Sequence, residues 1–187
     1  MRDWFQAVKI NFETLFLPMA GRPLAYLEVG VCRGVSLSWM LEHVLTHLDS
    51  RAVGVDVWDT GGIRRRGWVA GQWYTDAMAA IAPYGKATLV KANSHDYLQT
   101  IPSESFDIAY IDGDHLYSGV MQDSCEAWRI VREGGIIGWD DYNIGAGRAR
   151  SGRPAVMEAV NDFLANMGGR VEVLLEHKRQ RWVRKVR

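Results

Sequence analysis

Short runs of β-prone apolar residues alternate with longer segments of helical periodicity, and no other sequence feature restricts the fold of this chain as strongly. The β-prone runs span residues 24–29, 52–57, 87–92, 106–111 and 135–139. Apolar residues recur at helical spacing over residues 35–48, 75–82, 117–131 and 154–167. Because parallel strands need crossover connections, this alternation predicts a mostly parallel sheet with helices on both faces.

The two ends of the chain complete this plan. Residues 1–20 are expected to hold an opening amphipathic helix, because apolar residues fall at helical spacing before Pro18 and Gly21. Two β-prone runs, at 171–175 and 181–186, predict a terminal antiparallel hairpin. A length of 187 residues suits one domain. We therefore expect a single α/β domain over residues 1–187, with a doubly wound sheet of seven strands.

Composition and charge exclude several classes of protein. Hydrophobic residues make up 48% and charged residues 24%, which is typical of a globular chain. Lys plus Arg equals Asp plus Glu at 22 each, so no overall field attracts nucleic acid or an anionic membrane. Cys32 and Cys125 lie far apart, which favours a reducing compartment over a disulfide framework or zinc site. Charges interrupt the N-terminal region, so we expect a cytoplasmic protein without a signal peptide or membrane span.

A glycine-containing loop at 30–34 follows the first β-prone run and directly precedes a helix. Gly30 and Gly34 let the backbone turn tightly and let a ligand approach the helix N-terminus. Cys32 interrupts the GxGxxG pattern, which disfavours an NAD-dependent oxidoreductase. Glu28 lies in a buried strand and needs a partner, whereas Asp56 ends the next strand, where an acid can accept both ribose hydroxyls. This arrangement favours a nucleotide-like cofactor.

Acidic residues follow the fourth and fifth β-prone runs. Asp112 and Asp114 come after one, and Asp140 and Asp141 after the other. Carboxylates without a thiol or a His pair favour a hard cation such as Mg²⁺ or Ca²⁺. Residues 140 and 141 can face one ion only if the extended conformation ends by residue 139, which we expect. His115 adds a candidate general base, because its proton affinity suits neutral pH.

The glycine loop and the acid at the end of the second strand resemble the class I S-adenosylmethionine-dependent methyltransferases, and the resemblance spans nearly the whole chain. It implies a Rossmann-like sheet whose last strand is antiparallel. It also implies that Gly30 and Gly34 face the methionine moiety, that Asp56 holds the ribose and that Asn93-Ser94 contacts the adenine. The cofactor-binding residues expected on this basis are Glu28, Gly30, Gly34, Ser36, Asp56, Asn93, Ser94 and Asp112.

The acidic residues resemble a smaller branch, the metal-dependent O-methyltransferases of macrolide and aminocoumarin sugars, related to macrocin O-methyltransferase. That resemblance implies that Asp112, Asp140 and Asp141 bind Mg²⁺ and that Asp114 is the general base, with His115 as the rival base. The implied reaction transfers a methyl group from S-adenosylmethionine to a hydroxyl of a small molecule such as a sugar or natural product. In an alternative interpretation, Asp112 only orients the amino group of the cofactor.

Two other functions stay open at this point. The basic segment 178–187 suggests a nucleic-acid methyltransferase, although alternation in a hairpin explains the segment as one solvated face. Enzymes that methylate base amino groups usually carry an Asn/Asp-Pro-Pro-aromatic motif after the fourth strand, where residues 112–115 are Asp-Gly-Asp-His. A non-catalytic module that binds S-adenosylmethionine is the second alternative. The sequence identifies neither the acceptor nor the oligomeric state, and it is compatible with a homo-oligomer.

Overall fold

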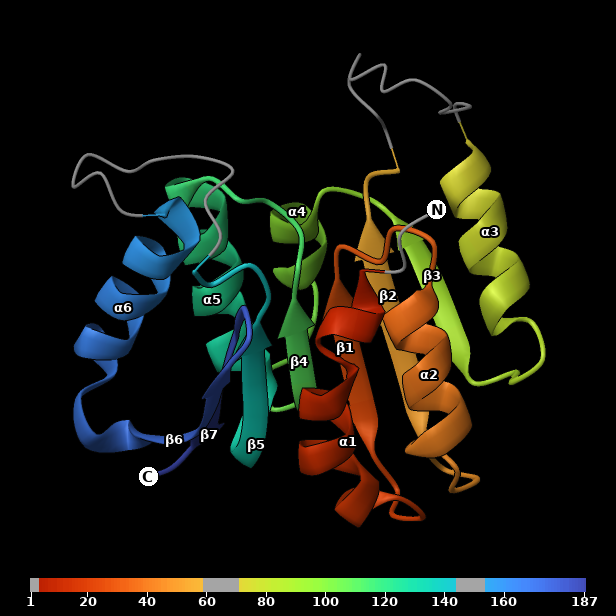
Figure 1. Ribbon diagram of the computed structural model, residues 1–187, viewed down its shortest axis with the longest axis horizontal. Coiled ribbons are helices and arrows are strands. Elements are labelled where there is room, and N and C mark those ends of the chain that lie inside the picture. The colour runs from red at the N-terminus through yellow and green to blue at the C-terminus, as the bar shows by residue number, and fades with distance from the viewer. Residues whose placement is uncertain (1–3, 59–70, 144–153) are drawn as a thin grey trace.

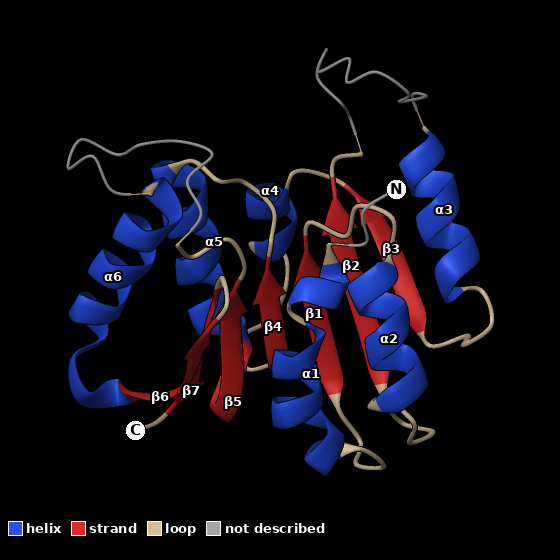
Figure 2. Cartoon of the chain, viewed as in Figure 1, coloured by secondary structure: helices blue, strands red, loops and turns tan. Residues whose placement is uncertain are grey.

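The computed structural model describes residues 4–58, 71–143 and 154–187. Seven strands form one sheet in the order β3-β2-β1-β4-β5-β7-β6, with helices on both sides (Figures 1 and 2). The strands are β1 Ala25–Val29, β2 Arg51–Asp56, β3 Ala87–Lys91, β4 Phe106–Ile111, β5 Val131–Trp139, β6 Val171–His177 and β7 Gln180–Lys185. The first five strands are parallel, whereas β7 pairs antiparallel with β5 and β6. The predicted α/β fold, with its mostly parallel seven-stranded sheet and C-terminal hairpin, is confirmed.

Six α-helices cover the sheet in the described part of the chain. They are α1 Lys9–Phe16, α2 Val35–His43, α3 Gln72–Ile81, α4 Ser94–Leu98, α5 Tyr117–Ile130 and α6 Ala155–Met167. Buried side chains of α1, α2 and α3 share one core with Tyr26, and those of α4, α5 and α6 share another with Leu27. Because successive strand residues point to opposite faces, β1 contributes to both cores and is buried throughout.

Several elements differ from the sequence-based expectation. The N-terminal region has 3₁₀ turns at Phe5–Ala7 and Leu17–Met19 around α1, in place of one helix over 1–20, and residues 1–3 of that prediction lie outside the described residues. Helix α4 was not predicted, because five residues are too few to show a helical period. Strand β5 begins at Val131, before the expected residue 135, and pairs there with Phe106 across a register shift. None of the described helices is long and apolar enough to cross a membrane.

The register of the sheet aligns the carboxyl ends of its central strands. Val29 pairs with Val55 and with Ile111, and Ile111 pairs with Trp139. The residues next in sequence are Gly30, Asp56, Asp112 and Asp140. In open α/β sheets ligands bind beyond this edge, so the fold collects the predicted cofactor loop and the predicted acids in one region.

Candidate functional site

The two glycines of the loop after β1 are required by the local geometry. Gly30 has φ +85°, and a Cβ there would collide with the backbone carbonyl of Asp112. Gly34, with φ +78°, caps the N-terminus of α2, and a Cβ there would lie 3.1 Å from Cα of Ala77. The loop can therefore pass this close to β4 and α3 only without side chains at these positions. The predicted contacts of both glycines with the cofactor stay predictions.

Asp56 holds this loop at the end of β2. Its Oδ2 accepts a hydrogen bond of 2.8 Å from the backbone N–H of Cys32, and its Oδ1 accepts one of 2.8 Å from that of Trp58. The indole N–H of Trp58 donates in turn to the carbonyl of Cys32 at 2.7 Å. A carboxylate oxygen accepts more than one hydrogen bond, so the predicted contact with ribose hydroxyls is compatible with this role.

Glu28 is fully buried in β1 beneath the loop. Its carboxyl group accepts hydrogen bonds from the hydroxyls of Tyr26, at 2.7 Å, and Ser36, at 2.6 Å. Burial raises the pKa of Glu28 to about 8, although both hydroxyls act in the opposite direction. The hydrogen-bonding partners expected for this buried acid are therefore Tyr26 and Ser36 of the protein itself. The hydroxyl of Ser36, one of the expected cofactor-binding residues, is directed to Glu28.

The polar residues after β3 also have partners within the fold. Asn93 is the N-cap of α4 and accepts the backbone N–H of Asp96, while the Ser94 hydroxyl donates to Asp123 Oδ1 at 2.7 Å. Asp123 lies in α5, and burial raises its pKa to about 6. No sequence motif singled out Asp123, because a single acid within an amphipathic helix gives no signal. The expected contact of residues 93 and 94 with adenine stays a prediction.

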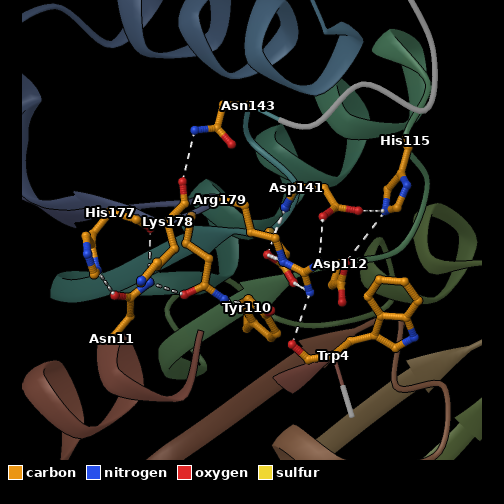
Figure 3. A network of polar contacts seen from close by, with 12 residues as sticks. Trp4, Asn11, Tyr110, Asp112, His115, Asp141, Asn143, His177, Lys178 and Arg179 are labelled. Atoms are coloured by element: carbon orange, nitrogen blue, oxygen red, sulfur yellow. Dashed lines mark hydrogen bonds and ion pairs between the residues drawn. The ribbon is translucent and has the colours of Figure 1, made fainter. Parts of the chain in front are cut away.

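The acids that follow β4 and β5 converge with His115 (Figure 3). His115 Nε2 lies 3.5 Å from Asp112 Oδ1 and 3.7 Å from Asp141 Oδ2. Strand β5 ends at Trp139, as expected, and Asp141 adopts a φ of +51°. That turn brings Asp141 to the same cluster as Asp112 although the two acids follow different strands.

Asp114, the other candidate base, faces elsewhere. Its Oδ1 accepts the backbone N–H of Leu116 at 2.9 Å, and its carboxyl group lies so close to Gly119 that a Cβ there would collide with it. Asp114 therefore sits against the start of α5, and of the two candidates His115 is the one beside Asp112 and Asp141.

Arg179 completes the cluster from the turn between β6 and β7, and sequence interpretation missed it. Its Nε lies 3.1 Å from Asp140 Oδ1, its Nη2 donates to Asp140 Oδ2 at 3.2 Å, and its Nη1 lies 3.5 Å from Asp141 Oδ1. Antiparallel pairing of Trp139 with Arg181 explains the position, since residues just before 181 then lie beside those just after 139. Only the docking of the hairpin on β5 reveals this partner.

The ionisation of the cluster is strongly perturbed. Burial, reinforced by the charges of Asp140 and Asp141, raises the pKa of Asp112 to about 7, while His115 opposes the shift. The pKa of His115 is raised above 6.5, mainly by its close contact with Asp112, although burial acts against this. Burial also raises the pKa of Asp140, and the guanidinium of Arg179 opposes that shift. The cluster therefore favours an added positive charge.

The donor set of the cluster fits a divalent cation. Asp112, His115 and Asp141 each offer one ligand atom, and these atoms lie within 4.8 Å of one another. The two carboxylates suit a hard cation such as Mg²⁺ or Mn²⁺, whereas the imidazole of His115 is a less usual ligand of these ions. Asp140, which the resemblance also implied as a ligand, is engaged by Arg179 through both oxygens. The structure thus brings together two of the three implied metal ligands and directs the third to a protein cation.

The basic segment at the C-terminus is mostly paired with other groups. The pairs are Arg181 with Glu176, Arg184 with Glu172, Arg187 with Glu133, and Lys185 with the carbonyls of Trp128 and Val131. Acids of the same chain therefore neutralise most of the positive charge of this segment. This disfavours the segment as a binding surface for nucleic-acid phosphates.

Solved structures with a similar fold include two methyltransferases of natural-product synthesis. The O-methyltransferase TomG from Streptomyces achromogenes, involved in tomaymycin synthesis and in complex with SAM, is 17% identical, with a TM-score of 0.67 over 100% of this chain and 82% of that chain. The MycE methyltransferase of the mycinamycin biosynthetic pathway, in complex with Mg, SAH and mycinamycin VI, is 18% identical. Its TM-score is 0.66, over 98% of this chain and 50% of that chain.

Sequence comparison gives the family. A curated relative, "Uncharacterized protein R132" of Acanthamoeba polyphaga mimivirus, is 29% identical over 147 residues, or 77% of this chain. The chain spans only 61% of the length of that relative. Residues 27–142 match the family described as a methyltransferase domain, and this match includes both the glycine loop and the acids after β5. The chain therefore belongs to the methyltransferase domain family.

Proposed function

We propose that this protein is an S-adenosylmethionine-dependent O-methyltransferase that acts, with the assistance of Mg²⁺, on a hydroxyl of a small molecule such as a sugar or natural product. The observation that carries the proposal is the direct contact between the two halves of the site, where the backbone at Gly30 lies against the backbone of Asp112. A cofactor at the glycine loop would therefore lie beside groups that accept a proton. Two proteins that share this fold support the proposal. TomG was solved in complex with SAM, and MycE was solved in complex with Mg, SAH and mycinamycin VI.

The protein has two tasks in such a reaction. A sulfonium methyl group is already activated, so the site must hold donor and acceptor in line and make the acceptor oxygen more nucleophilic. The loop at 30–34 and Asp56 would hold the adenosyl and methionine parts, with Glu28 and Ser36 supporting the loop from below. The acidic cluster would then receive the acceptor hydroxyl.

We assign the role of general base to His115. Its Nε2 would take the hydroxyl proton while the oxygen–methyl bond forms and the sulfur–methyl bond breaks, leaving S-adenosylhomocysteine and a methyl ether. The imidazolium formed in this step is stabilised by Asp112 and Asp141, whose carboxylates lie 3.5 and 3.7 Å away. Asp114 has no such position, because its carboxyl group accepts the backbone N–H of Leu116 and lies against the start of α5.

Mg²⁺ would be held by Asp112 and Asp141. Bound there, the ion would lower the proton affinity of the acceptor hydroxyl. Burial, together with the charges of Asp140 and Asp141, raises the pKa of Asp112, and the positive charge of the ion would favour its ionised form. Both cysteines are free in the structure, and we keep the cytoplasm as the proposed location.

Calorimetric titration with S-adenosylhomocysteine tests the first part of the proposal, and absence of binding at millimolar ligand would reject it. Incubation with S-adenosylmethionine, Mg²⁺ and a panel of nucleotide sugars and polyhydroxylated natural products, read by mass spectrometry, tests the second. Binding without methylation of any acceptor would favour a non-catalytic cofactor-binding module. A salt-sensitive shift of RNA in a gel would favour the nucleic-acid alternative.

A further inference from the structure

We propose that Arg179 is a built-in cation of the acidic cluster, which holds Asp140 away from the metal site and lowers the affinity of that site for divalent cations. The inference rests on the proposed function, because it concerns the same carboxylates. It adds a residue that determines how strongly this particular chain depends on a metal.

Arg179 contacts the acids of the cluster and also Trp4, whose carbonyl accepts from Nη2 at 3.5 Å and whose ring centroid lies 5.9 Å from the guanidinium. The guanidinium reaches both oxygens of Asp140, at 3.1 and 3.2 Å, and one oxygen of Asp141, at 3.5 Å. Its side chain is 14% exposed, and that of Asp140 only 3%, so water screens the pair weakly. The planar fork of Arg suits such two-point contacts, which the ammonium group of Lys does not reproduce.

The hairpin turn that carries Arg179 is fixed by neighbouring elements. The backbone N–H of Tyr142 donates to the carbonyl of Arg179 at 2.7 Å, and the Asn143 amide donates to the carbonyl of Lys178 at 2.9 Å. Asn11 of α1 donates to the carbonyl of His177 at 3.1 Å (Figure 3). Hydrogen bonds to neighbouring elements thus hold the backbone on both sides of the turn and fix the position from which the guanidinium extends.

This placement sets Arg179 and a metal ion in competition for the same negative charge. Asp141 belongs to the candidate metal site, where its Oδ2 faces His115, and its Oδ1 lies 3.5 Å from Arg179, so both cations would share one carboxylate. Two cations within a few ångströms repel each other, and the repulsion is strong where the groups are partly buried. Asp140 is withdrawn from the metal site by the same contact, which leaves two carboxylates there.

Binding of Mn²⁺, followed by electron paramagnetic resonance of the free ion, tests the inference on the full chain. We expect Arg179→Met to bind Mn²⁺ at least about tenfold more tightly than the wild type, the scale set by removing a unit charge within about 4 Å of a partly buried site. Adding Asp141→Asn to this variant should abolish the gain. Arg184→Met is the matched control, because Arg184 carries the same charge on β7 but pairs with Glu172.

Equal Mn²⁺ affinity of Arg179→Met and the wild type, or an equal gain in Arg184→Met, would overturn the inference. Removing one partner of a buried pair can prevent folding. If thermal melting shows this for Arg179→Met, then Arg179→Gln decides, because it also removes the charge but keeps a polar side chain, and wild-type Mn²⁺ affinity in that variant overturns the proposal. S-adenosylhomocysteine titration of the same samples separates the two hypotheses. Loss of that binding in the wild type rejects the proposed function, whereas unchanged Mn²⁺ affinity with that binding intact rejects only the role of Arg179.

Discussion

Replacing Glu28 with Gln removes one titrating group from the core while keeping its shape. Glu28 is buried beneath the glycine loop between the hydroxyls of Tyr26 and Ser36. An amide at this position can still hydrogen bond to both hydroxyls, but it carries no charge at any pH. Any difference in pH dependence between the two proteins therefore reports the carboxyl group itself.

The size of the effect follows from the shift in pKa. The pKa of Glu28 rises from 4.5 in the unfolded chain to about 8 in the folded protein. A raised pKa means that the folded state binds the proton more tightly, so the stabilisation is fully present below pH 4.5 and is lost as the pH rises through about 8. Between about pH 5 and about pH 8, the wild type should lose about 3 kcal/mol of unfolding free energy through this group.

Urea denaturation, followed by tryptophan fluorescence at intervals across that pH range, measures the prediction. Asp112 and Asp123 also have raised pKa values, about 7 and about 6, and they titrate in both proteins. The difference between the variant and the wild type therefore reports Glu28 together with its electrostatic interaction with Asp112. As the pH rises from the acid to the alkaline end of the range, the unfolding free energy of Glu28→Gln should increase by about 3 kcal/mol relative to that of the wild type. Parallel stability profiles would refute the reasoning, since they would mean that Glu28 ionises normally in the folded protein.

Four further predictions follow from the site and the sheet. His115→Gln should lower kcat/KM about a hundredfold or more, whereas Asp114→Asn should retain most activity; steady-state kinetics check this, and the reverse order would reassign the base. Turnover by the wild type should rise with pH as His115 loses its proton, with a midpoint above 6.5. Gly30→Ala should lower the free energy of unfolding by about 1–2 kcal/mol through its backbone conformation alone. It should also weaken the binding of S-adenosylhomocysteine in calorimetry, and unchanged affinity would contradict a tight loop. Gly138→Ala, whose Cβ would overlap the ring of Trp182, should cost about 1–3 kcal/mol in urea denaturation, and wild-type stability would show that the ring can move aside.

Sequence reasoning reached the acids at the strand ends but not their relative arrangement. The prediction that the extended conformation ends by Trp139 was correct, and with it Asp141 reaches the cluster. The sequence did not decide between Asp114 and His115, because it does not show which of two adjacent loop side chains points toward the other acids. Their separation depends on the hydrogen bond from the backbone of Leu116, which turns Asp114 toward α5.

The sequence by itself determined the fold class and the edge of the sheet that carries the site. Apolar period and turn residues are set by contacts between near neighbours in the chain, so the seven strands and the glycine loop could be inferred from them. Only the tertiary structure decided that Arg179 meets Asp140 across 39 residues of chain. That contact depends on the antiparallel docking of β7 on β5, and the register of such long-range pairing is fixed by the packing of the whole sheet, which no local pattern records.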